Sequence, residues 1–282
     1  MAELSYTLLR LLPKNTLSRA VGAACRANAP RPMVRAAIRA FARKYGVDVA
    51  ESERPIDEYA TFTDFFTRRL KPGSRPIAPG EGVPVSPVDG TVGELGEIVD
   101  SRLYQAKGKH YTLAELIGGP SAEEDARQFA GGAFCTIYLA PCDYHRIHAP
   151  LGGAIDGYVN MPGQLWPVNP LGLRNVDKLF CVNERLTTLL RTVRGPCGVV
   201  AVGATNVGRI RALYDDVTTN ARRTRQPARR LYEQPIPVGK GAELAVFEMG
   251  STVVVLFAPG VKLAHHLRPS SRIRLGEALE AP

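Results

Sequence analysis

The longest uninterrupted apolar run in the sequence spans only residues 253–258 and is rich in β-branched side chains. A run of this kind favours a buried strand. It is much shorter than the ~18 apolar residues that a membrane-spanning helix needs. Similar runs between glycines and prolines predict strands at 133–139, 154–159, 199–203, 244–249 and 252–257. These patterns predict an α+β fold with a mostly antiparallel β core.

The first seventy residues have a different pattern, which predicts short helices separated by proline. An apolar cluster at 8–12 ends at Pro13, and Asn15 is a candidate N-cap for a helix that runs to about residue 27. Pro32 suits the first turn of a further helix, and Gly46 suits its end. Thr61 is then a candidate cap for a short predicted helix that contains Phe62, Phe65 and Phe66.

The positive charge of the chain is concentrated in the same region. Residues 1–50 carry a net charge of +7, out of +9 for the whole chain. After Pro32, two helical stripes differ in character: Val34, Ile38 and Phe41 form one, and Arg35, Arg39 and Arg43 form the other. Such a helix packs on its own domain or lies in a membrane interface, and the arginine stripe favours the membrane. We therefore expect a helical, basic, membrane-associating region at 1–70 and a β-rich catalytic domain at 71–282.

Composition excludes several classes of protein. Hydrophobic residues make up 45% and charged residues 22% of the chain, which excludes a wholly disordered protein. Five cysteines without a CxxC pair favour a reducing cytoplasm over a disulfide framework. The N-terminus lacks the continuous apolar block of a signal peptide, so we expect none. A basic loop at 222–230 has no assigned role, and without a nucleic-acid-binding motif we expect no nucleic acid partner.

Three separated segments carry residues with catalytic chemistry. Asp89 lies in Ser-Pro-Val-Asp-Gly, His145 and His148 lie in Asp-Tyr-His-Arg-Ile-His, and Ser251 follows Gly250 in Glu-Met-Gly-Ser-Thr. An aspartate, a histidine and a serine are the components of a nucleophilic triad. The apolar run after Ser251 does not suit the exposed nucleophile of a typical hydrolase. It suits a strained Gly-Ser peptide in a closed site.

Each of these residues also has a simpler interpretation. Asp89 can cap a turn, and a glycine before a strand often marks a β-bulge. The two histidines can bind a metal together with Cys142 or Asp143, although HxxH without a partner pair is a weak zinc signal. We expect no metal.

The ordered set of segments resembles the phosphatidylserine decarboxylases, which are self-processing pyruvoyl enzymes, over nearly the whole chain. The resemblance rests on collinear motifs: Arg75-Pro76-Ile77, Ser86-Pro87-Val88-Asp89-Gly90, Lys107-Gly108, Asp143-Tyr144-His145-Arg146-Ile147-His148, Asn183-Glu184-Arg185, Val202-Gly203-Ala204-Thr205 and Gly250-Ser251-Thr252. Met249 replaces the usual leucine, which is a volume-conserving change. Residues 211–239 depart most from the family pattern, and the long acidic tail of some members is missing.

The resemblance implies roles for four residues. Asp89, His148 and Ser251 match the family's processing triad: Asp89 holds the tautomer of His148, and His148 deprotonates the Ser251 hydroxyl. The hydroxyl oxygen attacks the Gly250 carbonyl, the chain is cut between Gly250 and Ser251, and Ser251 becomes a pyruvoyl group. That group then acts as an electron sink while CO₂ leaves phosphatidylserine. His145 is the candidate proton donor that completes phosphatidylethanolamine.

The resemblance also implies a cellular setting. The substrate is a membrane lipid, so we expect a zymogen that matures into a peripheral enzyme on the cytoplasmic side of the cell membrane, attracted to anionic lipid. The family implies a homodimer of two-chain protomers. The alternatives are a pyruvoyl decarboxylase of a related phosphoserine lipid, a Ser-His-Asp hydrolase with an intact chain, and a basic membrane-binding module.

Overall fold

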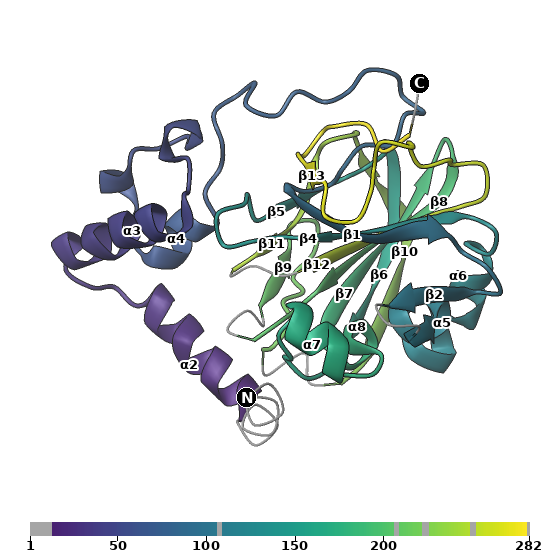
Figure 1. The fold of residues 1–282 in the computed structure, drawn as a ribbon, viewed down its shortest axis with the longest axis horizontal. Helices are drawn as coiled ribbons and strands as arrows, with labels where there is room; N and C mark the ends of the chain where they lie inside the picture. Colours follow the sequence, from purple (N-terminus) through teal and green to yellow (C-terminus); the bar gives the residue numbers. More distant parts are fainter. Residues whose placement is uncertain (1–12, 106–108, 206–208, 222–225, 249–251, 281–282) are drawn as a thin grey trace.

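The structure is a computed structural model that describes residues 13–105, 109–205, 209–221, 226–248 and 252–280 (Figure 1). The leucine cluster at 8–12, the Lys107-Gly108 motif and the Gly250-Ser251 pair lie outside the described residues. The described part mixes helices with antiparallel sheet and is mostly strand, as predicted, with a helical region at its N-terminal end.

The main sheet has eight strands in the order β10-β6-β7-β8-β12-β4-β1-β13. Every neighbouring pair in it is antiparallel. The bounds are β1 Gly90–Glu97, β4 Ala133–Tyr138, β6 Gly153–Met161, β7 Arg185–Thr192, β8 Gly195–Val202, β10 Ala228–Val238, β12 Thr252–Phe257 and β13 Arg272–Ile273.

Strand β12 is central in this sheet, between β8 and β4. Its side chains alternate between two hydrophobic clusters, one on each face. Val253 and Val255 belong to the first cluster, whereas Val254 and Leu256 belong to the second. Both faces are therefore buried, which explains why this strand is an uninterrupted apolar run.

Smaller elements cover the two faces. A three-stranded sheet of β5 Arg146–His148, β11 Glu243–Phe247 and β9 Ile210–Ala212 packs into the first cluster. Short helices pack into the second, together with the hairpin of β2 and β3. Their bounds are β2 Arg102–Gln105, β3 Lys109–Thr112, α5 Leu113–Ile117, η4 Gly119–Ala122, α6 Glu123–Arg127, α7 Pro170–Asn175 and α8 Leu179–Val182.

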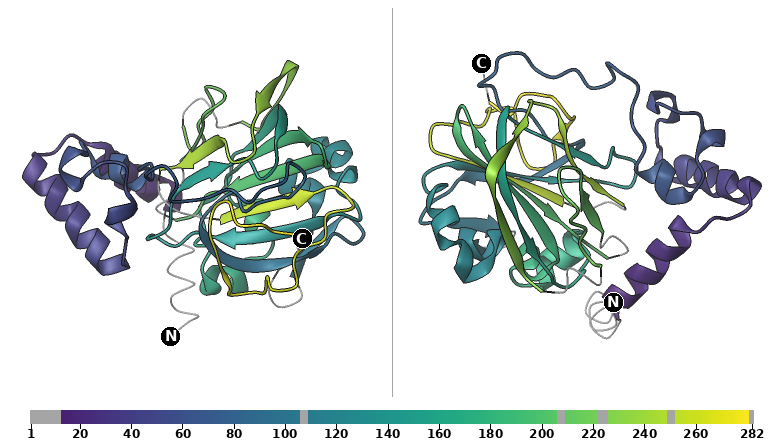
Figure 2. Two further views of the ribbon diagram at one scale, coloured as in Figure 1. Left: turned by 90° about the horizontal axis from the view of Figure 1, so that it is seen from above. Right: turned by 180° about the vertical axis from the view of Figure 1, so that it is seen from behind.

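The N-terminal helices lie to one side of the β-rich body (Figures 1 and 2). They are α2 Lys14–Arg26, α3 Arg31–Tyr45, η1 Val49–Glu51, η2 Ile56–Glu58 and α4 Phe62–Phe66. Two capping predictions are confirmed: Gly46 ends α3 in the left-handed conformation, and the Thr61 hydroxyl accepts the Asp64 N–H at 3.1 Å. The prediction for Asn15 is wrong. The helix begins at Lys14, and the Asn15 side chain instead donates to the Gly163 carbonyl at 2.9 Å.

The predicted lipid-facing stripe of α3 is also wrong. Val34 and Ile38 are buried in a small core with Tyr59 and Phe65, and Phe41 packs against it. The basic stripe is partly neutralised within the chain, because Arg35 and Arg39 both form ion pairs with Asp57. Intramolecular packing satisfies the same helical periodicity that membrane contact would. In the described ranges, no helix is both long and apolar enough to cross a bilayer.

Candidate active site

The segment that carries the two histidines connects the main sheet to the smaller one. It follows β4, which pairs with β12, and leads into β5, which pairs with β11. Strand β11 ends at Phe247 and β12 begins at Thr252, so the Gly250-Ser251 pair belongs to the short connection between them. The structure thus anchors the chain before and after the predicted cleavage site to the two ends of the histidine segment.

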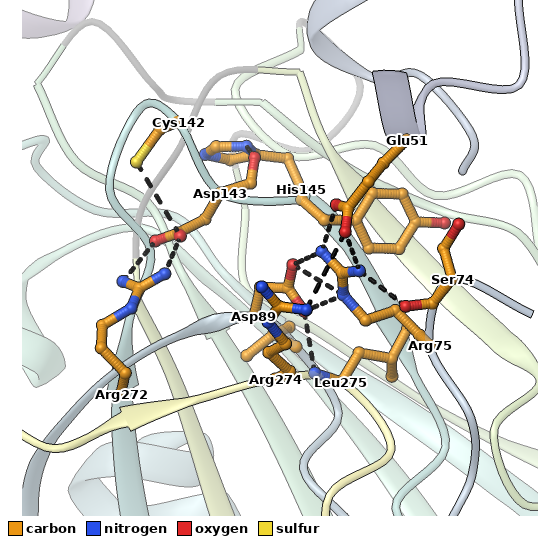
Figure 3. Close-up of polar contacts among 12 residues, drawn as sticks. Glu51, Ser74, Arg75, Asp89, Cys142, Asp143, His145, Arg272, Arg274 and Leu275 are labelled. Atoms are coloured by element: carbon orange, nitrogen blue, oxygen red, sulfur yellow. Dashed lines mark hydrogen bonds and ion pairs between the residues drawn. The ribbon is translucent and has the colours of Figure 1, made fainter. Parts of the chain in front are cut away.

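Asp89 lies directly before β1 and is buried in an ion-pair network (Figure 3). Arg75 donates from Nη2 to Asp89 Oδ2 at 2.7 Å and from Nε to Oδ1 at 2.9 Å. The backbone N–H of Leu275 donates to the same Oδ1 at 2.8 Å. On its other side Arg75 binds Glu51 through Nη1 and Nη2, at 3.0 and 2.8 Å. Two carboxylates therefore share one partly buried guanidinium.

His148 is held by the backbone. Its Nδ1–H donates to the carbonyl of Gly241 at 2.7 Å, which leaves Nε2 with a lone pair, 3.4 Å from the Tyr144 hydroxyl. The backbone N–H of His148 donates to the carbonyl of Pro87, which lies two residues before Asp89. Burial lowers the pKa of His148, whereas the nearby Asp89 charge acts in the opposite direction. Asp89 thus acts on His148 through charge, while Gly241 fixes the tautomer that was expected to depend on Asp89.

His145 is fully buried at the start of the same segment. Its Nδ1–H donates to the Asp143 carbonyl at 2.7 Å, and its Nε2 has no hydrogen-bond partner among the described residues. The ring of Phe66 lies against it, with 4.1 Å between the centroids. Burial lowers the pKa of His145 to about 3, and the positive charge of Arg68 acts in the same direction. The imidazole is therefore neutral, with a free lone pair on Nε2.

Asp143 fixes the turn that presents His145. Its side chain accepts the Ala140 N–H at 2.6 Å and forms an ion pair with Arg272 from β13 (Figure 3). These contacts give Asp143 a structural role. In the part of the chain that the structure describes, no group of three His, Cys, Asp or Glu side chains is arranged to hold a metal ion.

The structure brings Asp89, His145 and His148 into one region, while Ser251 lies outside the described residues. Sequence reasoning missed the contributions of Arg75, Glu51 and Gly241. Arg75 stands in a quoted motif, Arg75-Pro76-Ile77, which was a signal, but no sequence pattern connects Gly241 to a histidine 93 residues away.

Comparison with known proteins identifies the family. The sequence model described as phosphatidylserine decarboxylase matches residues 62–281, and a second model, PSD, matches residues 4–46. The chain belongs to the phosphatidylserine decarboxylase family. It is 55% identical over 279 residues to the phosphatidylserine decarboxylase proenzyme of Anaeromyxobacter sp. (strain K), covering 98% of each chain. It is 53% identical over 274 residues to that of Myxococcus xanthus (strain DK1622), covering 96% of each.

Membership of the phosphatidylserine decarboxylase family makes the chain a decarboxylase of phospholipid biosynthesis. The curated relatives are named proenzymes, in agreement with the prediction of a zymogen.

Proposed function

We propose that this protein decarboxylates phosphatidylserine to phosphatidylethanolamine with a pyruvoyl group, formed from Ser251 when the chain cleaves itself after Gly250. The observation that carries the proposal is the pair of buried histidines, each with Nδ1–H bound to a backbone carbonyl. Both belong to the segment that anchors the chain on either side of the Gly250-Ser251 bond. Two neutral imidazoles are thereby available for two successive proton transfers.

In the processing step, His148 is the base. Its lone pair on Nε2 accepts the proton of the Ser251 hydroxyl, and the oxygen attacks the Gly250 carbonyl as the Gly250-Ser251 peptide bond breaks. This acyl shift gives an ester, and β-elimination then releases the upstream chain with Gly250 as its new carboxylate end and leaves dehydroalanine at position 251. Addition of water and loss of ammonia convert that residue to the pyruvoyl group. The negative charge of Asp89, fixed by Arg75 and Leu275, stabilises the imidazolium form of His148.

In the decarboxylation step, the pyruvoyl group supplies an electron sink for the pair of electrons that CO₂ leaves behind. Neutral His145 first takes up at Nε2 a proton that the ammonium group of the substrate loses, and then delivers it to the carbon that CO₂ has left, since Nδ1 is bound to Asp143. Phe66 and the surrounding core exclude water from that nitrogen, because His145 has no exposed surface. Because this Nε2 is a buried polar atom with no partner among the residues that the structure describes, it fits a bound headgroup.

Membrane association is proposed on the surface of α2. The helix turns polar residues, Lys14 and Ser18, toward the body and leaves Leu17 exposed at 43%. On α3, Met33 is exposed at 64%. Outward apolar side chains on basic helices suit a peripheral enzyme on an anionic lipid surface, at the cytoplasmic side of the cell membrane.

The predicted division at residue 70 and the predicted homodimer of two-chain protomers remain part of the proposal. The division is supported by the separate small core around Ile38. One ring contact, between Phe66 and His145, joins the two sides of the division. The dimer is supported by β10, an edge strand of the main sheet on which Leu231 is 51% exposed.

Mass spectrometry of the purified protein, with an assay of CO₂ release from phosphatidylserine, tests the proposal. We expect two chains, 1–250 and 251–282, with a pyruvoyl group at the start of the smaller one. Ser251→Ala is expected to stay whole and inactive, because no oxygen is present for the acyl shift. A wild-type chain that is active while uncut would overturn the proposal.

A further inference from the structure

Arg68 is a buried arginine beside the candidate site. It lies two residues after the end of α4, and its backbone N–H donates to the Phe65 carbonyl at 3.1 Å. Only 3% of its surface is exposed. Its guanidinium carbon lies 5.0 Å from the centroid of the Phe65 ring, and Nη2 donates to the Cys142 carbonyl at 3.4 Å. Arg68 is thus fixed in the interior by an aromatic ring and one long hydrogen bond.

The rest of this guanidinium has no partner in the described part of the chain. Among the described residues, neither Nε nor Nη1 of Arg68 has a hydrogen-bond partner. The negative charges of Asp89 and Glu51 are within electrostatic reach of Arg68, but both carboxylates are bound by Arg75. Burial lowers the pKa of Arg68. A buried charge with unsatisfied donors is costly, so a group with oxygen acceptors would stabilise it.

Arg68 and His145 are held by the same turn. Arg68 binds the carbonyl of Cys142, and His145 binds the carbonyl of Asp143, the next residue. The positive charge of Arg68 is one cause of the lowered pKa of His145. An anion on Arg68 would offset that charge and make it easier for His145 Nε2 to take up a proton. The guanidinium of Arg68 is thus close enough to His145 for its charge to act on the imidazole.

From these contacts we infer that Arg68 binds the phosphodiester of the lipid headgroup. The inference rests on the proposed function, which brings an anionic phosphoserine headgroup to His145. A guanidinium offers two parallel N–H donors to two oxygens of a phosphate or carboxylate. The carboxylate loses its charge as CO₂ leaves, so an ion pair to it would stabilise the substrate more than the transition state. The phosphodiester keeps its charge throughout, so binding it carries no such penalty.

The test uses the processed enzyme and short-chain lipids that dissolve in water. The variants are Arg68→Gln and Arg68→Lys, and the control is Arg69→Gln, which removes a neighbouring arginine whose side chain is 58% exposed. Dihexanoyl phosphatidylserine gives KM and kcat. Dihexanoyl phosphatidylethanolamine, which keeps the phosphodiester and lacks the carboxylate, gives a Kd by calorimetry. Self-cleavage on a denaturing gel reports whether each variant folds.

We expect Arg68→Gln to be cleaved like the wild type. It should raise the KM for the substrate and the Kd of the product by a similar factor, about ten- to a hundred-fold. Arg68→Lys should recover part of this loss, and Arg69→Gln should match the wild type. A raised KM with an unchanged product Kd would mean that Arg68 binds the carboxylate, which overturns the inference. Failure of both Arg68 variants to be cleaved would also overturn it, by assigning Arg68 to processing or folding. A wild type that releases no CO₂ would instead refute the proposed function.

Discussion

The backbone N–H of Phe247 donates to the carbonyl oxygen of His145 at 3.0 Å. This bond ties the last residue of β11 to the histidine proposed to carry the proton in decarboxylation. On the other side of the predicted cleavage site, Thr252 pairs with Tyr138 and Val202 in the main sheet. Cleavage between these anchors would leave both new chain ends attached to the body, close to the histidine segment.

The two products of cleavage should therefore stay together. The smaller chain would contribute β12, which is paired on both sides, and the backbone N–H of Leu279 donates to the Pro84 carbonyl. We expect the fragment 251–282 to co-elute with the larger chain in gel filtration and to separate only in denaturant. Loss of the fragment in native buffer would contradict the sheet order.

The histidines are expected to divide the two reactions. His148→Ala should slow cleavage by about a hundred-fold or more, because the base for the Ser251 hydroxyl is lost. His145→Ala should be cleaved but release little CO₂. Asp89→Asn should slow cleavage less than His148→Ala, since it removes charge and not the base. Time courses on gels measure cleavage, and CO₂ assays measure decarboxylation. If His148→Ala is cleaved and His145→Ala stays uncut, the two histidines have the reverse roles.

Sequence reasoning identified strands whose sequence is mostly apolar and missed strands with more polar sequences, including β7, which is mostly buried. Strand β12 was predicted with its bounds, and β4 to within one residue, because both are mostly apolar in sequence. Strand β10 was missed because it is an edge strand, exposed along most of its length, in an arginine-rich segment. Two of those arginines, Arg229 and Arg230, form ion pairs with Asp125 and Asp215, which no local pattern predicts.

The candidate site was predicted in the same uneven way. The family motifs indicated Asp89, His145 and His148, which the structure places in one region, and their catalytic roles stay predictions. Their partners were not predicted, because Gly241 contributes only a backbone carbonyl, and the Glu51–Arg75–Asp89 network depends on the tertiary fold. Burial of Val34 and Ile38 was missed because periodicity defines an apolar stripe without saying what covers it.

Gly241 provides a test of the contact that orients His148. Its φ is +78°, and a Cβ there would lie 2.9 Å from Ile77 Cδ1. We expect Gly241→Ala to cost about 1–2 kcal/mol of unfolding free energy and to slow cleavage, because the carbonyl that holds Nδ1 would shift. Gly239→Ala is the matched control, since the structure leaves open space around its Cβ. Equal cleavage rates for the two variants would show that the Gly241 carbonyl is not needed.

The neutral state of His145 predicts a pH dependence of stability. Its pKa is lowered from 6.5 to about 3, so the unfolded chain binds a proton that the folded chain does not. The stabilisation is complete above about pH 6.5 and declines by about 1.4 kcal/mol per pH unit as the pH falls toward 3. In the uncut Ser251→Ala background, His145→Gln should lose that part of the acid sensitivity in urea unfolding. The exposed His265→Gln is the control, and parallel pH curves for all three would refute the burial argument.

The outward face of α2 predicts the apolar part of membrane binding. Leu17 is 43% exposed on a helix that turns Lys14 and Ser18 inward, so we expect Leu17→Glu to weaken binding to anionic vesicles by about tenfold. Val193→Glu, at a 66% exposed position in a turn of the β-rich body, should bind like the wild type. High salt should weaken the binding of both variants to the vesicles, because the Debye length falls to about 3 Å at 1 M. The difference in binding between the two variants should persist. Vesicle sedimentation measures this difference. Equal binding of the two variants at low salt would show that the outward face of α2 does not enter the lipid surface.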